Sequence, residues 1–394
     1  MKRQEGSVTS KEHKKHTALV KPSIGNYGRN EWAIVGAPCT VIKLLADEVI
    51  KTLSTNYKCA YIDTTHTDDI VLPPGRLAAG ANMEYTDQID YRQINFAGQL
   101  NSFEMKQQLA QADVVLINGN HHKAAAQIVV IDENKRASLK KRVAELTNVK
   151  MILLAANSTE VFDFIQEAIP YWKNLPIYSL DETGKIIAFF ERQMQEAKPK
   201  LNGLVLAGGQ SLRMGFDKGS VKWHGREQRY HVADMLKSYC KDIFISIRSE
   251  QKDDIYGYQT LEDTFTGLGP YGAILSAFRA QPDAAWLVVA SDLPLLDDGT
   301  LQYLSANRNT ASVATAFNSA FDGFPEPLIT IWEPKSYPVL LSFLAQGYSC
   351  PRKVLINSDT TLLNAPNPDT LTNVNTPDEL DNIKRRLHQQ IAAE

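Results

Sequence analysis

The run from Leu201 to Lys218, LNGLVLAGGQSLRMGFDK, constrains the fold more than any other stretch of the chain. Its aliphatic residues Leu204–Leu206 predict a buried strand, which ends at a pair of glycines, Gly208–Gly209. Adjacent glycines directly after a strand let backbone N–H groups approach an anion without a Cβ in the way. Arg213 and Lys218 add two cations suited to phosphate oxygens. From the residues alone, a plain glycine-rich turn with surface basic residues stays open, and the family resemblance given below decides in favour of a phosphate-binding loop.

A second pattern lies about 80 residues further on, where Trp286–Leu296 reads WLVVASDLPLL. A wholly apolar strand is typical of the centre of a sheet, and Asp292 follows its carboxyl end, where open α/β sheets bind ligands. A carboxylate there is a suitable ligand for Mg²⁺, which keeps waters and shares substrate phosphates. Alone, the motif equally fits a strand-to-turn transition. Together with the glycine loop, it predicts a metal ligand at Asp292.

The chain has 394 residues, a formal net charge of −3 and 43 % hydrophobic residues, which predicts two domains and no general nucleic-acid binding. Its four cysteines form no C-x-x-C pair, so we expect reduced thiols in a cytoplasmic protein. No apolar run approaches the roughly 18 residues of a membrane span, and the polar, basic start does not resemble a secretory signal. We expect residues 1–29 to form a mobile tail.

The first half opens with a predicted strand, Trp32–Val35, a loop at Gly36 and a helix reaching Leu53. Strand, glycine loop and helix are the setting of a phosphate-binding P-loop, G-x-x-x-x-G-K-[ST]. Val41 and Ile42 replace the second glycine and the lysine, and Lys43 stands where the hydroxyl belongs. Because Lys43 is one position late, about 100° around the helix, we do not expect triphosphate hydrolysis here.

Four further strands are predicted in this half, at 59–63, 113–119, 127–131 and 149–155, and they predict a parallel three-layer α/β domain. We interpret Thr64–Asp69 as a hydrogen-bonded loop rather than a metal cluster, and His121 and His122 as surface residues. An amphipathic helix over 185–200 ends at Pro199, so the predicted domains are 30–195 and 200–394.

In the second half we expect a helix over 229–240, a strand over 242–247 and another that ends at Asp263. The segment from Gly267 to Gly272 satisfies G-x-G-x-x-G, the fingerprint of dinucleotide-binding folds. However, no strand immediately precedes its first glycine, and Pro270 removes a backbone donor. We therefore do not expect this segment to bind a dinucleotide, and the guanylyltransferase resemblance described next implies that it opens a helix beside the nucleotide.

Two resemblances follow from these motifs. Leu206–Lys218 is similar to L-A-G-G-x-S-x-R-M-G-x-D-K, and Asn373–Leu380 to N-V-N-T-P-E-E-L, so the second half resembles molybdenum cofactor guanylyltransferases. The stretches GAPCTVIK, YIDTTHTDD and ADVVLINGNHH resemble the molybdopterin-guanine dinucleotide biosynthesis adapter protein, with the P-loop dismantled. The resemblances imply two three-layer α/β domains: a degenerate P-loop-like domain and a Rossmann-like nucleotidyltransferase domain.

The guanylyltransferase resemblance also implies site residues. Lys218, Arg213 and Asp292 would be catalytic, with Mg²⁺ on Asp292. Nucleotide-binding positions would be Leu206, Ala207, Gly208, Gly209, Lys218, Ser246, Asp263 and Asp292. Ser246 stands where the family often has asparagine, which weakens any contact assigned to it. Arg352, Lys353, Asn373 and Asn375 would bind the pterin substrate, although Thr376 also has a structural explanation as a helix cap followed by Pro377.

The expected reaction is transfer of GMP from GTP to the phosphate of molybdopterin, with Mg²⁺, releasing pyrophosphate. Expected partners are GTP, molybdopterin and other proteins of molybdenum cofactor biosynthesis, with no nucleic acid and no membrane. Two alternatives stay open: a related cytidylyl- or sugar-nucleotidyltransferase, and a cofactor-delivery scaffold with weak catalysis.

Overall fold

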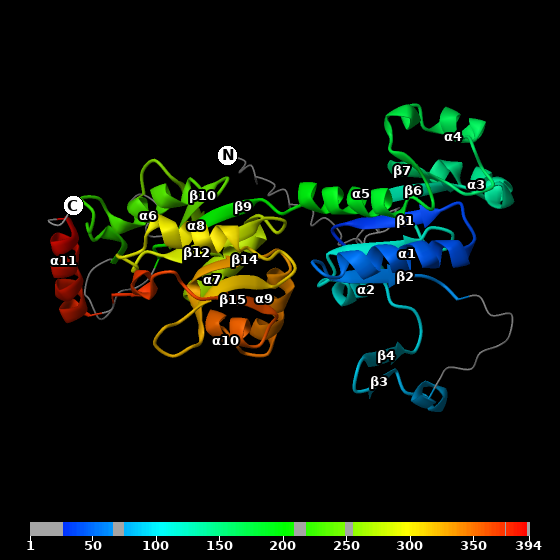
Figure 1. Cartoon of the computed structure of the whole chain (residues 1–394). Helices are drawn as coiled ribbons and strands as arrows, with labels where there is room; N and C mark the ends of the chain where they lie inside the picture. The colour runs from blue at the N-terminus through cyan, green and yellow to red at the C-terminus, as the bar shows by residue number, and fades with distance from the viewer. Residues whose placement is uncertain (1–26, 66–74, 209–217, 249–254, 375, 392–394) are drawn as a thin grey trace, which may run out of the picture. The chain divides into compact units, whose positions relative to one another are not determined.

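The computed structural model describes residues 27–65, 75–208, 218–248, 255–374 and 376–391, and its elements are labelled in Figure 1. The chain divides into two compact units that are not continuous in sequence. The first takes in the described residues up to Ala46, then Ala60–Leu109 and Val115–Asp181. The second takes in Asp47–Cys59, Ala110–Val114 and the described residues from Glu182 onward. The domain limits expected from the sequence remain a prediction.

The first half of the chain builds a six-stranded sheet in the order β2-β5-β1-β6-β7-β8. β1 lies parallel to β5 and β6, and β7 lies parallel to β6 and β8. The strands are β1 (Glu31–Val35), β2 (Cys59–Ile62), β5 (Val114–Asn118), β6 (Ala126–Ile131), β7 (Val149–Leu154) and β8 (Ile177–Ser179). β1, β5 and β6 are buried along their whole length, as expected of strands covered on both faces.

Four described helices of this half precede or follow strands of this sheet along the chain, and a fifth lies between β8 and the first strand of the second sheet. They are α1 (Cys39–Leu53), α2 (Ser102–Gln108), α3 (Arg136–Lys141), α4 (Asp163–Ala168) and α5 (Thr183–Glu196), with short 3₁₀ turns at Gly75–Ala79, Glu133–Lys135, Val143–Glu145 and Trp172–Asn174. A separate antiparallel hairpin joins β3 (Met83–Asp87) to β4 (Arg92–Phe96). The hairpin and β8 were not expected from the sequence, whereas the predicted strands and the helix reaching Leu53 are present.

The second half builds a seven-stranded sheet in the order β11-β10-β9-β12-β14-β13-β15. β9, β10, β11 and β12 are mutually parallel neighbours, whereas β14 runs antiparallel to β12 and β13. The strands are β9 (Leu201–Leu206), β10 (Ile243–Ile247), β11 (Gln259–Glu262), β12 (Ala285–Ala290), β13 (Ala314–Asn318), β14 (Pro325–Trp332) and β15 (Thr360–Leu363). The helices are α6 (Gln228–Leu236), α7 (Pro270–Ala280), α8 (Asp298–Ala306), α9 (Ser336–Ala345), α10 (Pro351–Ile356) and α11 (Pro377–Ile391), with 3₁₀ turns η5 (Lys218–Ser220) and η7 (Pro368–Leu371).

Side-chain alternation along these strands sends successive residues into two separate cores. Val205 and Leu287 pack with α6 and α8 on one face of the sheet. Leu204 and Trp286 pack with α7, α9 and α10 on the other face (Figure 1). The second half is therefore a three-layer α/β structure, as predicted.

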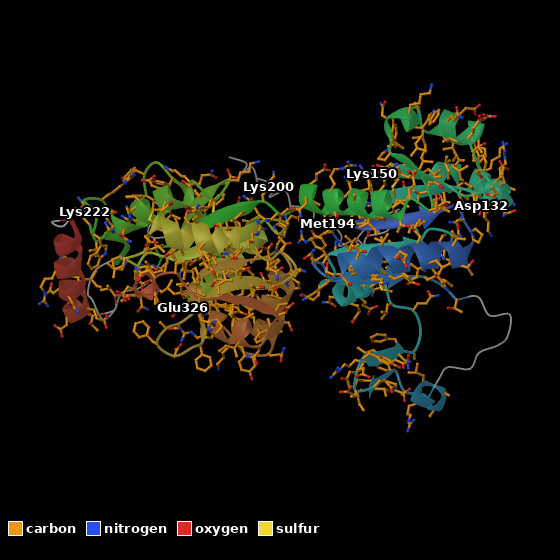
Figure 2. All side chains as sticks on the ribbon, in the orientation of Figure 1. Asp132, Lys150, Met194, Lys200, Lys222 and Glu326 are labelled. Carbon is orange, nitrogen blue, oxygen red and sulfur yellow. The ribbon has the colours of Figure 1, made fainter. Side chains whose placement is uncertain are left out.

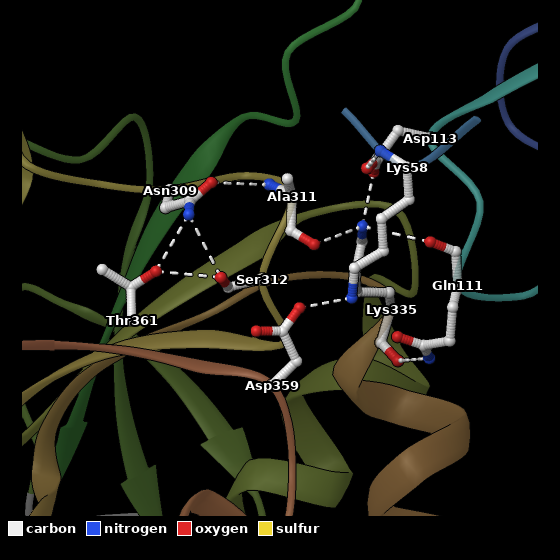
Figure 3. A network of polar contacts seen from close by, with 9 residues as sticks. All are labelled: Lys58, Gln111, Asp113, Asn309, Ala311, Ser312, Lys335, Asp359 and Thr361. Atoms are coloured by element: carbon white, nitrogen blue, oxygen red, sulfur yellow. Dashed lines mark hydrogen bonds and ion pairs between the residues drawn. The ribbon is translucent and has the colours of Figure 1, made fainter. Parts of the chain in front are cut away.

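Two of the ion pairs described in the second unit are buried. Arg308 and Glu333 form a bidentate pair at 2.6 and 2.9 Å, and both side chains are almost fully buried. Figure 3 shows the other pair, in which Lys335 donates to Asp113 at 2.5 Å and to the carbonyl of Ala311 at 2.9 Å. Burial lowers the pKa of Lys335, and the carboxylate of Asp113 opposes that shift. Each buried charge thus has a partner, as its desolvation requires.

Within the described residues, no helix combines the length and the apolar character needed to cross a membrane.

Candidate active site

The carboxyl ends of four neighbouring strands meet at one edge of the second sheet. Leu206 at the end of β9 is the register partner of Ser246 on β10 and of Ala290 on β12. Beyond the strand, Ser291 donates from its hydroxyl to the carbonyl of Leu206 at 2.9 Å. Gly208, Ser246 and Asp292 therefore lie at or within two residues of these strand ends. The two strongest sequence motifs meet at this edge, as the hypothesis of one shared site requires.

The glycine loop is described as far as Gly208. A Cβ placed on Gly208 would contact the backbone nitrogen and Cγ of Arg248 at 3.6 Å, so the loop leaves β9 beside the end of β10. Gly209 and Arg213 lie outside the described residues. Lys218 begins the 3₁₀ turn η5, and only its backbone is described. The assigned roles of these three residues remain predictions.

Ser246 and Asp263 form a hydrogen-bonded pair at the same edge. The Ser246 hydroxyl is buried and donates to Oδ1 of Asp263 at 2.9 Å. The backbone N–H of Asp263 donates to the carbonyl of Ile247 at 3.1 Å, which holds the residue at the end of β10. Burial raises the pKa of Asp263 to about 6, and the hydrogen bond from Ser246 opposes that shift. A desolvated carboxylate of this kind is typical of a ligand-binding position.

Asp292 lies against the C-terminal motif. The backbone N–H of Val374 donates to the carbonyl of Asp292 at 3.0 Å, which brings the neighbouring, exposed Asn373 to this part of the site. Val374 itself is buried in a small apolar cluster with α11, Trp223 and Leu295. Asn375 lies outside the described residues. The structure thus brings the third sequence motif beside the second.

The expected cap of α11 is present as a capping box. The Thr376 hydroxyl accepts from the N–H of Glu379 at 3.3 Å, and the Glu379 carboxylate accepts from the N–H of Thr376 at 3.1 Å. This arrangement satisfies two N–H groups at the start of the helix. The motif therefore has a structural role, whatever its asparagines contact.

The basic pair expected to bind the pterin substrate, Arg352 and Lys353, has other contacts within the protein. Arg352, in the first turn of α10, donates to Asp322 at 2.7 Å and to Glu326 at 3.3 Å. Glu326, which Figure 2 labels, lies at the start of β14. Lys353 lies over the ring of Tyr348, 5.3 Å from its centroid. Because two carboxylates neutralise Arg352, an anionic substrate would have to compete with them.

Two side chains that the sequence did not single out hold the loop after Asp292. Nε2 of His224 lies 3.0 Å from the carbonyl of Pro294, and the Gln228 side chain donates to the carbonyl of Leu293 at 3.0 Å. The two residues of each contact are 70 and 65 positions apart in the sequence, respectively. No local motif marks such residues, because their role depends on long-range packing.

In the first unit, the expectation that His121 is a surface residue is wrong, whereas His122 is partly exposed and makes its contact with Thr64 at the surface. The His121 side chain is only 13 % exposed and lies 3.3 Å from Sγ of Cys39. His122 contacts the hydroxyl of Thr64 at 2.9 Å. The strand ends of the parallel sheet bring these segments together, which single-residue polarity does not reveal.

Comparison with known proteins agrees with the resemblance of the second half to guanylyltransferases. A family model described as a MobA-like NTP transferase domain matches residues 203–361. A molybdenum cofactor guanylyltransferase of Shewanella baltica is 30 % identical over 154 residues, which cover 38 % of this chain and 76 % of that protein. The chain belongs to the molybdenum cofactor guanylyltransferase family. Its second half carries a nucleotidyltransferase domain.

Other relatives of this guanylyltransferase-family chain differ in length. A molybdenum cofactor biosynthesis bifunctional protein of Synechocystis sp. is 33 % identical over 177 residues. The match covers 44 % of this chain, and the chain spans about half of that relative, 51 %. A crystal structure of molybdopterin-guanine dinucleotide biosynthesis protein A from Archaeoglobus fulgidus has 20 % identity and a TM-score of 0.41, covering 48 % of this chain and 99 % of that one.

Proposed function

We propose that the second half transfers GMP from GTP to the phosphate of molybdopterin and releases pyrophosphate. Family membership supports the substrates, because relatives that match this half are named molybdenum cofactor guanylyltransferases. The observation that carries the proposal is the register of β9 with β10 and β12, which collects Gly208, Ser246, Asp263 and Asp292 at one sheet edge.

In this proposal, an oxygen of the molybdopterin phosphate attacks the α-phosphorus of GTP, and the bond from that phosphorus to the pyrophosphate breaks. Backbone N–H groups from Leu206 to Gly209 hold the nucleotide beside the half-buried carboxylate of Asp263. Lys218 and Arg213 neutralise charge on the phosphates. Catalysis then comes from positioning and charge stabilisation, with little covalent work for the protein.

A magnesium ion fits the residues at this edge. Mg²⁺ is usually held by one or two carboxylates together with substrate phosphates and waters. Asp292 supplies one carboxylate, and the described residues hold no cluster of three His, Cys, Asp or Glu side chains able to bind a metal by themselves. The donor set thus suits an ion that arrives with the triphosphate. When held by Asp292, Mg²⁺ would offset the negative charge of the phosphates.

The test is pyrophosphate release by Asp292→Asn, measured with GTP in the presence and absence of molybdopterin. We expect a loss of about 100- to 1000-fold, or about 2.7–4 kcal/mol, as for removal of one group that stabilises the transition state. Asp298→Asn is the matched control, because Asp298 is exposed, six residues away, and used here only through its backbone carbonyl. An Asp292→Asn protein that keeps wild-type rates would refute the assignment. A panel with CTP and ATP tests the base, since preference for CTP would favour the cytidylyl alternative.

We also infer that the first unit is a degenerate P-loop-like adapter domain that does not hydrolyse GTP. Support comes from its parallel sheet and from the loop at Gly36 between β1 and α1. Lys43 lies 3.4 Å from a carboxylate oxygen of Asp63, so its charge is engaged within the protein. Calorimetric titration of the whole chain with GTP should then give one site per chain. Two sites would contradict the inference.

A further inference from the structure

A thiol, an imidazole and a carboxylate meet at the strand ends of the first unit, and the guanylyltransferase proposal uses none of them. Cys39 is the first residue of α1, directly after the loop that follows β1. Its Sγ lies 3.3 Å from Nε2 of His121, which follows β5. The same Nε2 lies 3.6 Å from Oδ1 of Asp63, which follows β2. Three loops that are distant in sequence thus deliver three reactive groups to one point.

The carboxylate of Asp63 is held in its charged form. Burial alone would raise its pKa, but three groups more than offset that effect and hold the pKa below its usual value. The backbone N–H of Thr64 donates to it at 2.7 Å, the hydroxyl of Tyr61 donates at 3.2 Å, and Nζ of Lys43 lies 3.4 Å away. A negative charge beside His121 stabilises the protonated imidazole, which is the form produced when the imidazole takes a proton from the thiol.

The turn that carries His121 is anchored on both sides. The Asn120 side chain donates to the carbonyl of Ala37 at 2.8 Å and to Sγ of Cys39 at 3.7 Å. The guanidinium of Arg142 donates to the carbonyls of Gly119 and Asn120. Rigid placement of this kind is what a reactive site needs and what a flexible surface loop lacks.

The buried side chain of Asn118 is a second observation that points to a ligand at this turn. Its side chain is completely buried, and its Oδ1 accepts from the N–H of Asn120 at 3.1 Å. Its amide nitrogen has no hydrogen-bond partner among the described residues. A buried donor without a partner costs about 1–3 kcal/mol, so its presence beneath the turn calls for an acceptor from a ligand or a water.

The other three cysteines lie in different surroundings. Burial, with a contribution from Asp113, raises the pKa of Cys59 to about 11, and burial raises the pKa of Cys240 to about 12. Both thiols therefore stay protonated and unreactive at neutral pH. Cys350 is exposed and serves as the accessible reference thiol, whereas Cys39 is partly exposed and faces an imidazole.

We propose that Cys39 is a nucleophilic thiol, with His121 as its proton acceptor, that adds covalently to α,β-unsaturated carbonyl compounds. The S–H proton passes to Nε2 of His121, and the sulfur forms a bond to the β-carbon of the electrophile. The displaced electron pair of the double bond moves to the α-carbon, which then takes the proton back from the imidazolium. Atoms and charge balance without a further reactant. Asp63 acts as a positioning residue for the imidazole.

The test labels the full chain with acrylamide at neutral pH and follows each cysteine by peptide mass spectrometry. We expect Cys39 to react about tenfold faster than Cys350, because thiolate character controls the rate. His121→Gln should bring the rate at Cys39 down to that of Cys350 or below, and Asp63→Asn should give an intermediate rate. The matched control is His122→Gln, which replaces the neighbouring imidazole that contacts Thr64 instead of the thiol.

Two results would overturn the proposal: Cys39 in the wild-type chain reacting no faster than Cys350, or an unchanged Cys39 rate in a folded His121→Gln protein. Circular dichroism of each variant reports whether it is folded. If a variant unfolds, the wild-type ratio of Cys39 to Cys350 decides alone. None of these outcomes depends on guanylyl transfer, because the labelling needs no nucleotide.

Discussion

Replacing Asp263 with asparagine should make the protein more stable and a poorer enzyme. Asp263 is desolvated at the end of β10, and its pKa is raised to about 6 from an ordinary 3.8. Because the folded state binds the proton more tightly than the unfolded chain, its contribution to stability is fully present below pH 3.8. That contribution is lost as the pH rises through about 6. Above that pH the folded protein holds a carboxylate that would be better solvated in the unfolded chain.

The size of the effect follows from the two pKa values. A difference of about two pKa units corresponds to about 3 kcal/mol at most. Since the carboxyl is partly exposed, solvent screening reduces this to about 1–2 kcal/mol. Asparagine keeps an oxygen that can accept from the Ser246 hydroxyl but carries no charge. At about 2–4 °C per kcal/mol, Asp263→Asn should raise the melting temperature at pH 8 by roughly 2–8 °C.

Thermal unfolding at pH 8 and pH 4.5, without nucleotide, measures this directly. The gain should be present at pH 8 and reduced to about a third at pH 4.5, where Asp263 of the folded wild-type protein is mostly protonated but that of the unfolded chain is not. Glu262→Gln is the matched control, since it removes an exposed carboxylate from the adjacent position. In Asp263→Asn, kcat/KM for GTP should fall about 10- to 100-fold, as for loss of a charged hydrogen bond of about 1.5–3 kcal/mol. A melting temperature that rises equally at both pH values, or does not rise at all, would refute the reasoning.

Two further substitutions test the packing that positions the site. Gly272→Ala in α7 would place a Cβ 2.1 Å from a backbone carbonyl oxygen. Chemical denaturation should therefore show the free energy of unfolding lowered by about 2–3 kcal/mol or more. Gly299→Ala in α8 is the control, because the nearest atom to its Cβ lies at 3.7 Å and the substitution should cost nothing. An equal effect of both would contradict the steric argument. Glu333→Gln leaves Arg308 buried without a full counter-charge and should cost about 3–5 kcal/mol in the same assay; a loss below 1 kcal/mol would show that the pair is not buried as described.

The sequence predicted the parts of the fold that depend on local pattern. Runs such as Trp286–Ala290 are apolar throughout, and only a central, doubly covered strand explains that composition. The segment from Gly267 to Gly272, GLGPYG, was expected to open a helix, and α7 begins at Pro270. The structure adds a reason for its last glycine, because the carbonyl of Phe265 leaves no room for a Cβ at Gly272. That constraint depends on tertiary packing, so a motif alone does not reveal it.

The candidate site was predictable where a motif and a strand end coincide, and not elsewhere. Asp292 follows an unmistakable strand, so its edge of the sheet was predictable. The hydrogen bond between Ser246 and Asp263 joins residues on neighbouring strands, and the sequence does not state which strands are neighbours. The same limit applies to Asp63 and His121, whose contact depends on strand order. Polar residues that follow different strands of one predicted sheet should therefore be considered together as a possible site before any of them is assigned to the surface.

The edges of the two sheets at the carboxyl ends of their strands carry different sets of polar groups. In the second unit, Gly208 and Asp292 lie within two residues of neighbouring strand ends, at the edge where the proposed function requires a triphosphate and a metal ion. In the first unit, the corresponding edge holds Asp63, whose lowered pKa keeps it ionised at neutral pH, and Lys43 is already engaged with that carboxylate. A triphosphate bound after Gly36 would therefore meet an additional negative charge and a lysine that has another partner. If the first unit is the P-loop-like domain proposed above, restoring nucleotide binding there would require neutralising Asp63 as well as placing a lysine at position 42, so a single substitution should not suffice.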